Sequence, residues 1–128
     1  MTASDAWQFA GVVLPWIRAL RRPGAPAQGF VQGGVGTDAR RMLAPLPLEP
    51  TNVTGLRHLD GVLSMAHGEN ADLGNCNFSI MVGPNPSLDA RPGFRGYAVF
   101  GRVIEGMDVV KRILALPTGG GEGAMKGQ

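Results

Sequence analysis

The chain has 128 residues, of which 44% are apolar and 17% charged, a composition typical of one globular domain rather than of a disordered chain. A formal net charge of +2 is too small to indicate a nucleic-acid partner by itself. The single cysteine, Cys76, excludes an intramolecular disulfide, and no apolar run reaches the length of a membrane span. No basic residue precedes the apolar segment 9–17, so the sequence predicts no signal peptide and a cytoplasmic location.

The first third of the chain predicts short extended segments separated by breaks. Pro15 interrupts the apolar segment 7–20, which favours a turn there followed by a strand over 16–20. Residues 21–29 are rich in proline and glycine and predict a loop, and three prolines keep 38–55 extended and loop-like. Further strands are predicted over 30–33, 61–66, 77–83 and 97–104, with a loop over 84–96.

Residues 105–116 carry the strongest helical pattern. Met107, Val110, Ile113 and Leu114 recur at helical spacing, and Pro117 ends the segment. Acidic residues begin it and basic residues follow, which suits the helix dipole. Many strands with one helix predict a β-rich domain, a barrel or a sandwich with a capping helix, and a flexible glycine-rich tail over 118–128.

Several kinds of chemistry lack their sequence patterns. The chain has no phosphate-binding loop and no nucleophile elbow of the Gly-x-Ser-x-Gly type. His58, His67 and Cys76 lack the spacing of metal ligands, so we expect no metal and no other cofactor. The basic doublets at 21–22 and 40–41 have no interleaved aromatic residues and favour a solvated surface over a nucleic-acid patch.

Five short motifs in a fixed order resemble the cyclophilin family of peptidyl-prolyl cis-trans isomerases. In this chain "GFVQGG" (29–34) resembles the family's Gln-Gly-Gly strand end. The segment "GVLSMA" (61–66), preceded by "LDG" (59–61), resembles the family's Leu-Ser-Met-Ala strand. The strand and loop "NFSIMVGPNPSLD" (77–89) and the long segment "YAVFGRVIEGMDVVKRI" (97–113) also resemble the family.

The resemblance implies a mainly β fold, an incomplete cyclophilin-like antiparallel β-barrel with a capping helix near 106–116. The implied domain covers residues 16–117, preceded by an unmatched segment, 1–15, and followed by the tail, 118–128. Cyclophilin domains are longer, so the chain looks truncated at both ends and a barrel built from it would have open edges.

The resemblance implies two catalytic residues. "WIRAL" (16–20) fits the family's aromatic-x-Arg-hydrophobic strand, which makes Arg18 the candidate catalytic arginine, and Gln32 matches the active-site glutamine. The spacing between them is longer than in the family, so residues 21–29 look like an insertion. Arg21 or Arg22 is the alternative if the alignment shifts.

The resemblance also implies a set of substrate-binding residues. Two of them depart from the family: Asn77 replaces a glutamine, and Ser79 replaces the phenylalanine at the floor of the proline pocket. Tyr97 stands where many members have histidine. The full set is Phe30, Ala66, His67, Gly68, Asn77, Ser79, Leu88 and Tyr97.

The implied function is isomerisation of X–Pro bonds in peptides and proteins, assisting folding, with activity reduced by Asn77 and Ser79. The expected partners are proline-containing peptides or unfolded proteins, with no nucleic acid and no membrane. Two alternatives stay open: a non-catalytic proline-peptide-binding or chaperone-like module, and a remnant that does not fold alone. Structural roles also stay open, since Arg18 could face solvent and Phe30 and Leu88 could be ordinary core.

Overall fold

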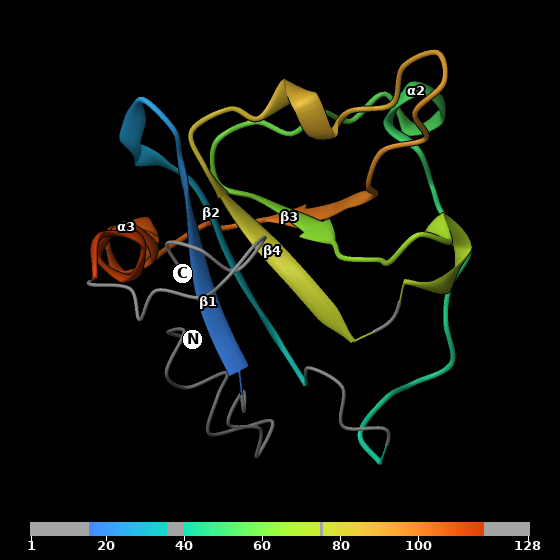
Figure 1. Cartoon of the computed structure of the whole chain (residues 1–128), viewed down its shortest axis with the longest axis horizontal. Coiled ribbons are helices and arrows are strands. Elements are labelled where there is room, and N and C mark those ends of the chain that lie inside the picture. Colours follow the sequence, from blue (N-terminus) through green and yellow to red (C-terminus); the bar gives the residue numbers. More distant parts are fainter. Residues whose placement is uncertain (1–15, 36–39, 75, 117–128) are drawn as a thin grey trace.

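A computed structural model describes residues 16–35, 40–74 and 76–116 (Figure 1). They form a five-stranded sheet of order β1-β2-β4-β3-β5 in which all neighbouring strands are antiparallel. Within this part of the chain the outer strands β1 and β5 do not pair, so the sheet is open. The strands are β1 (Trp16–Arg22), β2 (Ala25–Gly34), β3 (Val62–Met65), β4 (Asn77–Val82) and β5 (Val99–Arg102).

Two α-helices and two 3-10 turns complete the described chain: α2 (Thr51–Thr54), η1 (Ala71–Leu73), η2 (Pro86–Leu88) and α3 (Met107–Ala115). The mainly β fold and the helix expected near 106–116 are confirmed. The predicted segments 1–15 and 118–128 lie outside the described residues. No helix within the described ranges has the length and apolar character needed to cross a membrane.

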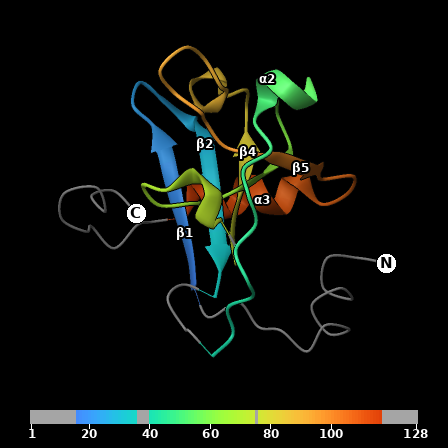
Figure 2. The same ribbon diagram turned by 90° about the vertical axis from the view of Figure 1, so that its right-hand side faces the viewer.

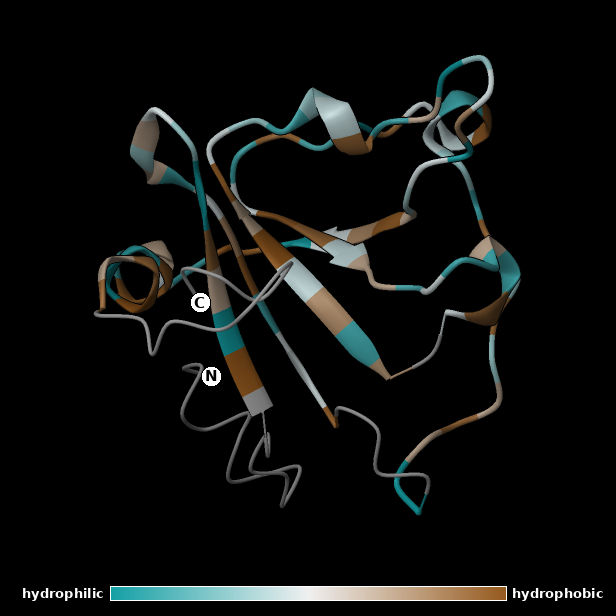
Figure 3. Cartoon of the chain, in the orientation of Figure 1, coloured by the Kyte–Doolittle hydropathy of each residue, from teal (hydrophilic) through white to brown (hydrophobic). Residues whose placement is uncertain are grey.

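Helix α3 covers one face of the sheet, and the connecting loops lie over the other (Figures 1 and 2). Its buried Val110 and Leu114 pack against a cluster that includes Ala19, Val31 and Val82 from three strands. Because side chains alternate along a strand, every second residue faces this helix. Figure 3 shows both hydrophobic and hydrophilic residues on α3.

A second, smaller cluster lies on the opposite face of the sheet. Val62, Met81 and Val99 are buried there, and Phe30 and Leu88 pack against them. The sheet therefore has apolar contacts on both faces, one under the helix and one under the loop that carries η2. This second face also carries the polar residues expected at the site.

The segment predicted as a loop over 21–29 is instead a β-hairpin, so that prediction was wrong. Only Pro23 and Gly24 form the turn, with Gly24 at a φ of +80°, a conformation that glycine adopts without strain. Arg22 pairs with Ala25 beside the turn, and hydrogen bonding to β1 holds the segment extended. The expected loop over 38–55 likewise contains the single helical turn α2, which ends at Gly55.

A bulge in this hairpin decides which side chains share a face. Arg21 pairs with Gly29 but Arg22 pairs with Ala25, so residues 26–28 have no pairing partner in β1. If residues 26–28 paired one by one with β1 instead of bulging out, Arg18 would lie opposite Gly29, and Gln32 would point to the other face. The three unmatched residues shift the register so that Arg18 lies opposite Gln32.

The packing of α3 predicts the effect of truncating its buried side chain. Leu114 is 1% exposed, and Leu114→Ala should lower the free energy of unfolding by about 2–5 kcal/mol, since it removes buried methyl groups and leaves a cavity. Val109 lies on the same helix but is 42% exposed, so Val109→Ala should change stability by less than about 1 kcal/mol. Urea denaturation of both variants measures this, and equal losses would contradict the packing described.

Candidate functional site

A row of polar residues crosses the sheet opposite α3. Arg18 lies opposite Gln32, Gln32 opposite Ser79, and Ser79 opposite Ser64, so β1, β2, β4 and β3 each contribute one side chain. Arg18 Nε donates a hydrogen bond to Gln32 Oε1 at 2.8 Å. The structure thus brings together the two residues that the sequence proposed as catalytic.

The alternative arginines lie elsewhere. Arg21 Nε donates to the carbonyl of Leu114 at 2.8 Å, and Arg21 Nη2 donates to the carbonyl of Leu116. A cation suits the carbonyl end of a helix, so Arg21 fastens β1 to the end of α3. Arg22 is exposed and donates to Gln28 within the hairpin. Neither arginine pairs with Gln32 in the sheet.

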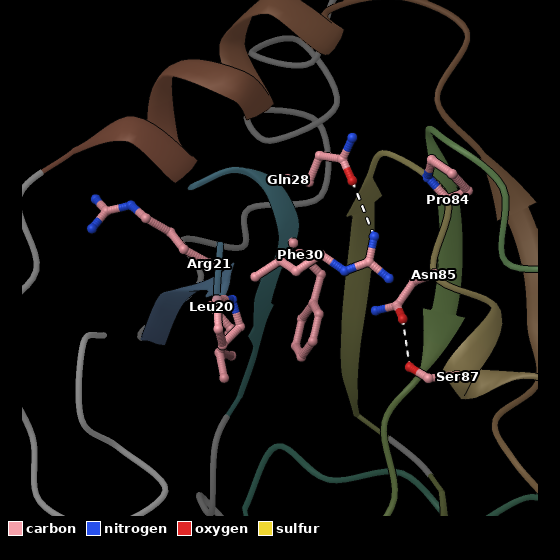
Figure 4. A pocket seen from close by; sticks show the side chains of 10 residues that line it. Leu20, Arg21, Gln28, Phe30, Pro84, Asn85 and Ser87 are labelled. Atoms are coloured by element: carbon pink, nitrogen blue, oxygen red, sulfur yellow. Dashed lines mark hydrogen bonds between the residues drawn. The ribbon is translucent and has the colours of Figure 1, made fainter. Parts of the chain in front are cut away.

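Phe30 lies on the same face as Gln32, two residues along β2, and reaches the apolar cluster that Leu88 also contacts. Phe30 also borders a cavity of about 280 Å³ between the β1–β2 hairpin and the turn after β4. Figure 4 shows Pro84, Asn85 and Ser87 lining its other side. Two of the expected pocket residues therefore meet on one apolar surface beside the polar row.

Ser79 does not provide the exposed apolar surface that a pocket wall requires. Its exposed fraction is 7%, and it lies in the middle of the polar row between Gln32 and Ser64. A hydroxyl at this position contributes little apolar surface next to Phe30. The Ser79 hydroxyl thus falls directly beside the paired Arg18 and Gln32.

The expected residues Ala66, His67 and Asn77 lie just after the end of β3 and at the start of β4. The backbone N–H of Ala66 donates to the carbonyl of Asn77 at 3.0 Å, which continues the pairing of β3 with β4. A Cβ placed on Gly34 would come within 2.3 Å of Asn77 Oδ1, so the Asn77 side chain packs closely on the end of β2. The half-buried His67 follows and stacks on Tyr97, with ring centroids 4.1 Å apart.

Leu88 and Tyr97 are held together by the loop between them. The N–H of Tyr97 donates to the carbonyl of Leu88 at 3.1 Å. Gly96 has a φ of +73°, and a Cβ there would lie 2.6 Å from the same carbonyl oxygen, so only glycine fits this close approach. The tightness of this turn places the two expected site residues side by side.

A buried hydrogen-bond chain beneath this loop was missed by sequence reasoning. His58 is 1% exposed; its Nδ1 lies 2.7 Å from Asp89 Oδ1 and its Nε2 lies 2.8 Å from Ser64 Oγ. The N–H of His58 also donates to Asp89 Oδ1. A neutral ring protonated on Nδ1 satisfies the chain, because Nδ1–H donates to the carboxylate and Nε2 accepts the hydroxyl proton.

The order serine, histidine, carboxylate is that of a hydrolase triad, but this arrangement cannot act as one. Ser64 is 2% exposed, so no substrate carbonyl can approach its oxygen. The hydrogen bonds of His58 instead join Ser64 of β3 to Asp89, the residue that follows Leu88, and so fix the start of the loop from Leu88 to Tyr97. Asp89 lies 31 residues from His58 in the sequence, and no local spacing pointed to this contact.

A second polar link ties η1 to the same loop. Arg95 donates through both Nη atoms to the two Asp72 oxygens at 3.0 Å, and the Leu48 N–H donates to Asp72 as well. Hydrogen bonding from Arg95, followed by that from Leu48, lowers the pKa of Asp72 below its ordinary value. Among the described residues, no group of three or more potential ligands could hold a metal ion.

Residues 24–127 match the sequence profile described as cyclophilin type peptidyl-prolyl cis-trans isomerase/CLD. A peptidyl-prolyl cis-trans isomerase of Acinetobacter baylyi is 40% identical over 86 residues, which are 67% of this chain and 46% of that protein. Peptidyl-prolyl cis-trans isomerase A of Dickeya dadantii is 36% identical over 96 residues, 75% of this chain and 49% of that protein. Isomerase cyp18 of Streptomyces antibioticus is 37% identical over 100 residues, 73% and 59% of the two chains.

The chain belongs to the cyclophilin-type peptidyl-prolyl cis-trans isomerase family. It spans about half the length of the relatives described above. The open sheet of the described residues agrees with an incomplete cyclophilin-like barrel.

The buried histidine chain predicts an effect on stability. Asp89→Ala removes the acceptor for the His58 ring and backbone, and a buried donor left without a partner should cost about 1–3 kcal/mol of unfolding free energy. Asp108→Ala is the matched control, because Asp108 forms an exposed pair with Arg112 at 3.3 Å and should matter by less than about 1 kcal/mol. Thermal unfolding of both compares them, and a loss no larger for Asp89 would show that the chain is not structural.

Proposed function

We propose that this chain catalyses cis–trans isomerisation of X–Pro bonds in peptides and in unfolded proteins. The observation that carries the proposal is the hydrogen-bonded pair Arg18–Gln32, on an outer face of the sheet beside the apolar Phe30 and Leu88. The family of the chain supports the same reaction. The activity of the relatives belongs to longer proteins, and its transfer to this chain is part of the proposal.

The reaction needs no nucleophile and no cofactor. Rotation about a peptide bond breaks its resonance, at a cost of about 18–20 kcal/mol without a catalyst. A catalyst must bind the twisted amide better than either planar form. Preorganised hydrogen-bond donors near the reacting amide provide such differential binding.

Arg18 is the donor in this proposal. Its guanidinium is always charged and presents donors in a fixed, planar fork. Gln32 accepts a hydrogen bond from Nε at 2.8 Å and so fixes the plane of that fork relative to the sheet. As the amide twists, its nitrogen regains a lone pair that a fixed donor can stabilise.

The substrate's proline ring would lie on Phe30 and Leu88. The backbone of residues 66–68 and the Asn77 amide would hold the flanking peptide, and Tyr97 would close the loop side of the groove. Ser79 supplies no ring against the proline. The proposal therefore includes weaker substrate binding, and reduced activity, relative to a site with phenylalanine at this position.

A second function deserves testing because Ser79 and Asn77 stand where the family has phenylalanine and glutamine. In this alternative the chain binds proline-containing segments without accelerating their isomerisation. Binding of an Ala-Pro peptide with no rate increase at high protein concentration would support this alternative over the enzyme.

Replacing the arginine tests the enzyme directly. Arg18→Ala should lower kcat/KM for an Ala-Pro peptide by roughly 100-fold, the usual effect of losing one preorganised donor, and should leave the fold intact. Arg22→Ala is the matched control, since Arg22 is exposed in the same hairpin, and its activity should stay near wild type. A protease-coupled assay with circular dichroism measures both. Loss of activity in Arg22→Ala alone would transfer the role to that arginine.

The hairpin bulge yields an independent test of the same pair. Deleting residues 26–28 joins Ala25 directly to Gly29, so regular pairing from the turn still places Arg18 opposite Gln32. We expect the deletion variant to keep activity near that of the wild type. Ala27→Ser, which keeps the length of the bulge, should also leave activity unchanged. A folded deletion variant as inactive as Arg18→Ala would show that the pairing of Arg18 with Gln32 is not enough to build the site.

A further inference from the structure

His67 has an unusual set of hydrogen-bond partners. Its Nδ1 lies 2.6 Å from the carbonyl oxygen of Gly68, and its Nε2 lies 2.7 Å from the carbonyl oxygen of Gly96. Both partners are backbone carbonyls, which accept hydrogen bonds and cannot donate them. The ring thus connects two segments that are 28 residues apart in the sequence, the 66–68 segment and the loop that ends at Tyr97.

The protonation state of the ring decides how many of these contacts are hydrogen bonds. A neutral imidazole carries one N–H, so one nitrogen would direct its lone pair at a carbonyl oxygen and repel it. An imidazolium carries two N–H groups and donates to both carbonyls. The geometry around His67 is therefore satisfied only by the protonated ring.

The other histidine of the chain shows the contrast. His58 lies between a carboxylate, which accepts, and the Ser64 hydroxyl, which can donate or accept, so its neutral ring satisfies both contacts. The two histidines of this chain thus occupy opposite kinds of site. His58 serves as an internal reference for any measurement on His67.

The groups around the His67 ring favour its protonated form. Tyr97 stacks on the ring at an interplanar angle of 16°, and an aromatic face attracts a cation. Asp72 contributes negative charge nearby, which the paired Arg95 guanidinium partly offsets. Hydrogen bonding from Arg95 and Leu48 lowers the pKa of Asp72, so this carboxylate stays ionised near neutral pH. Glu69, two residues along the loop, is exposed.

We propose that protonated His67 is a positioning residue that clamps the peptide-binding segment 66–68 onto the Gly96–Tyr97 loop, so that the groove binds proline peptides more tightly at acidic than at alkaline pH. The proposal rests on the proposed function, since it assigns His67 a role in that groove. The clamp is closed when the ring is protonated. It loses one of its two hydrogen bonds when the ring releases its proton, because a neutral imidazole carries a single N–H.

The expected effect is on binding rather than on the chemical step. Rotation of the prolyl bond transfers no proton, and the clamp holds backbone that would contact the peptide in its ground and transition states alike. The loss of one hydrogen bond should weaken peptide binding by about three- to tenfold. The turnover number should change much less than the dissociation constant.

The first experiment follows the full chain by NMR from pH 5 to 8 without peptide. The ring-nitrogen shifts of His67 should show both nitrogens protonated at low pH. The amide signals of Glu69 and Tyr97, whose peptide groups contain the two accepting carbonyls, should move with the same midpoint. These amides should not move with pH in His67→Gln. If the amide signals of Glu69 and Tyr97 do not shift when the His67 ring changes protonation, the proposed clamp is refuted, whether or not the protein is an isomerase.

The second experiment measures the dissociation constant of an Ala-Pro peptide at pH 5.5 and pH 8. This constant should rise about three- to tenfold with pH in the wild type and in Arg102→Gln, which removes an exposed positive charge from the end of β5. His67→Gln should bind at both pH values as the wild type does at pH 8. A wild-type constant that does not change with pH would refute the positioning role. Failure to bind at any pH would refute the proposed function, while the NMR titration still decides the clamp.

Discussion

The antiparallel pairing of β1 with β2 is the constraint on which the site depends. A strand sends alternate side chains to opposite faces, so the register of this one pair decides whether Arg18 meets Gln32 or is separated from it by the sheet. The same register sends Ala19 and Val31 to the face under α3. Packing of the helix face and construction of the polar row are therefore two results of one alignment, and neither can shift by a residue without the other.

Around this row, two histidines perform different tasks. His58 is buried and links β3 to the loop that carries Leu88, through partners that its neutral ring satisfies. His67 lies at the margin of the groove between two carbonyls that only a charged ring satisfies. The loop from Leu88 to Tyr97 is thus fixed near its start, at Asp89, by a contact that needs no charge, and near its end, at Gly96, by one that depends on protonation.

Much of this architecture could be predicted from the sequence. The helix over Met107–Ala115 and most strands follow from periodicity and from motifs that resemble the family. The hairpin could not be read locally, because its prolines and glycines favour a loop and only pairing with β1 makes the segment a strand. The choice among Arg18, Arg21 and Arg22 was open for the same reason, since the bulge at residues 26–28 sets the register and has no sequence signature of its own.

The position of Arg18 on an outer strand has a consequence for how the protein would fail under stress. Within the described chain, β1 pairs only with β2, whereas Gln32 lies on a strand paired on both sides. Outer strands fray at lower free energy than inner ones. Besides β2, β1 is anchored by Ala19, which packs in the cluster under α3, and by the hydrogen bonds of Arg21 to the end of α3. Mild heating would therefore withdraw Arg18 from Gln32 while the rest of the sheet persists, and the proposed activity would be lost before global unfolding.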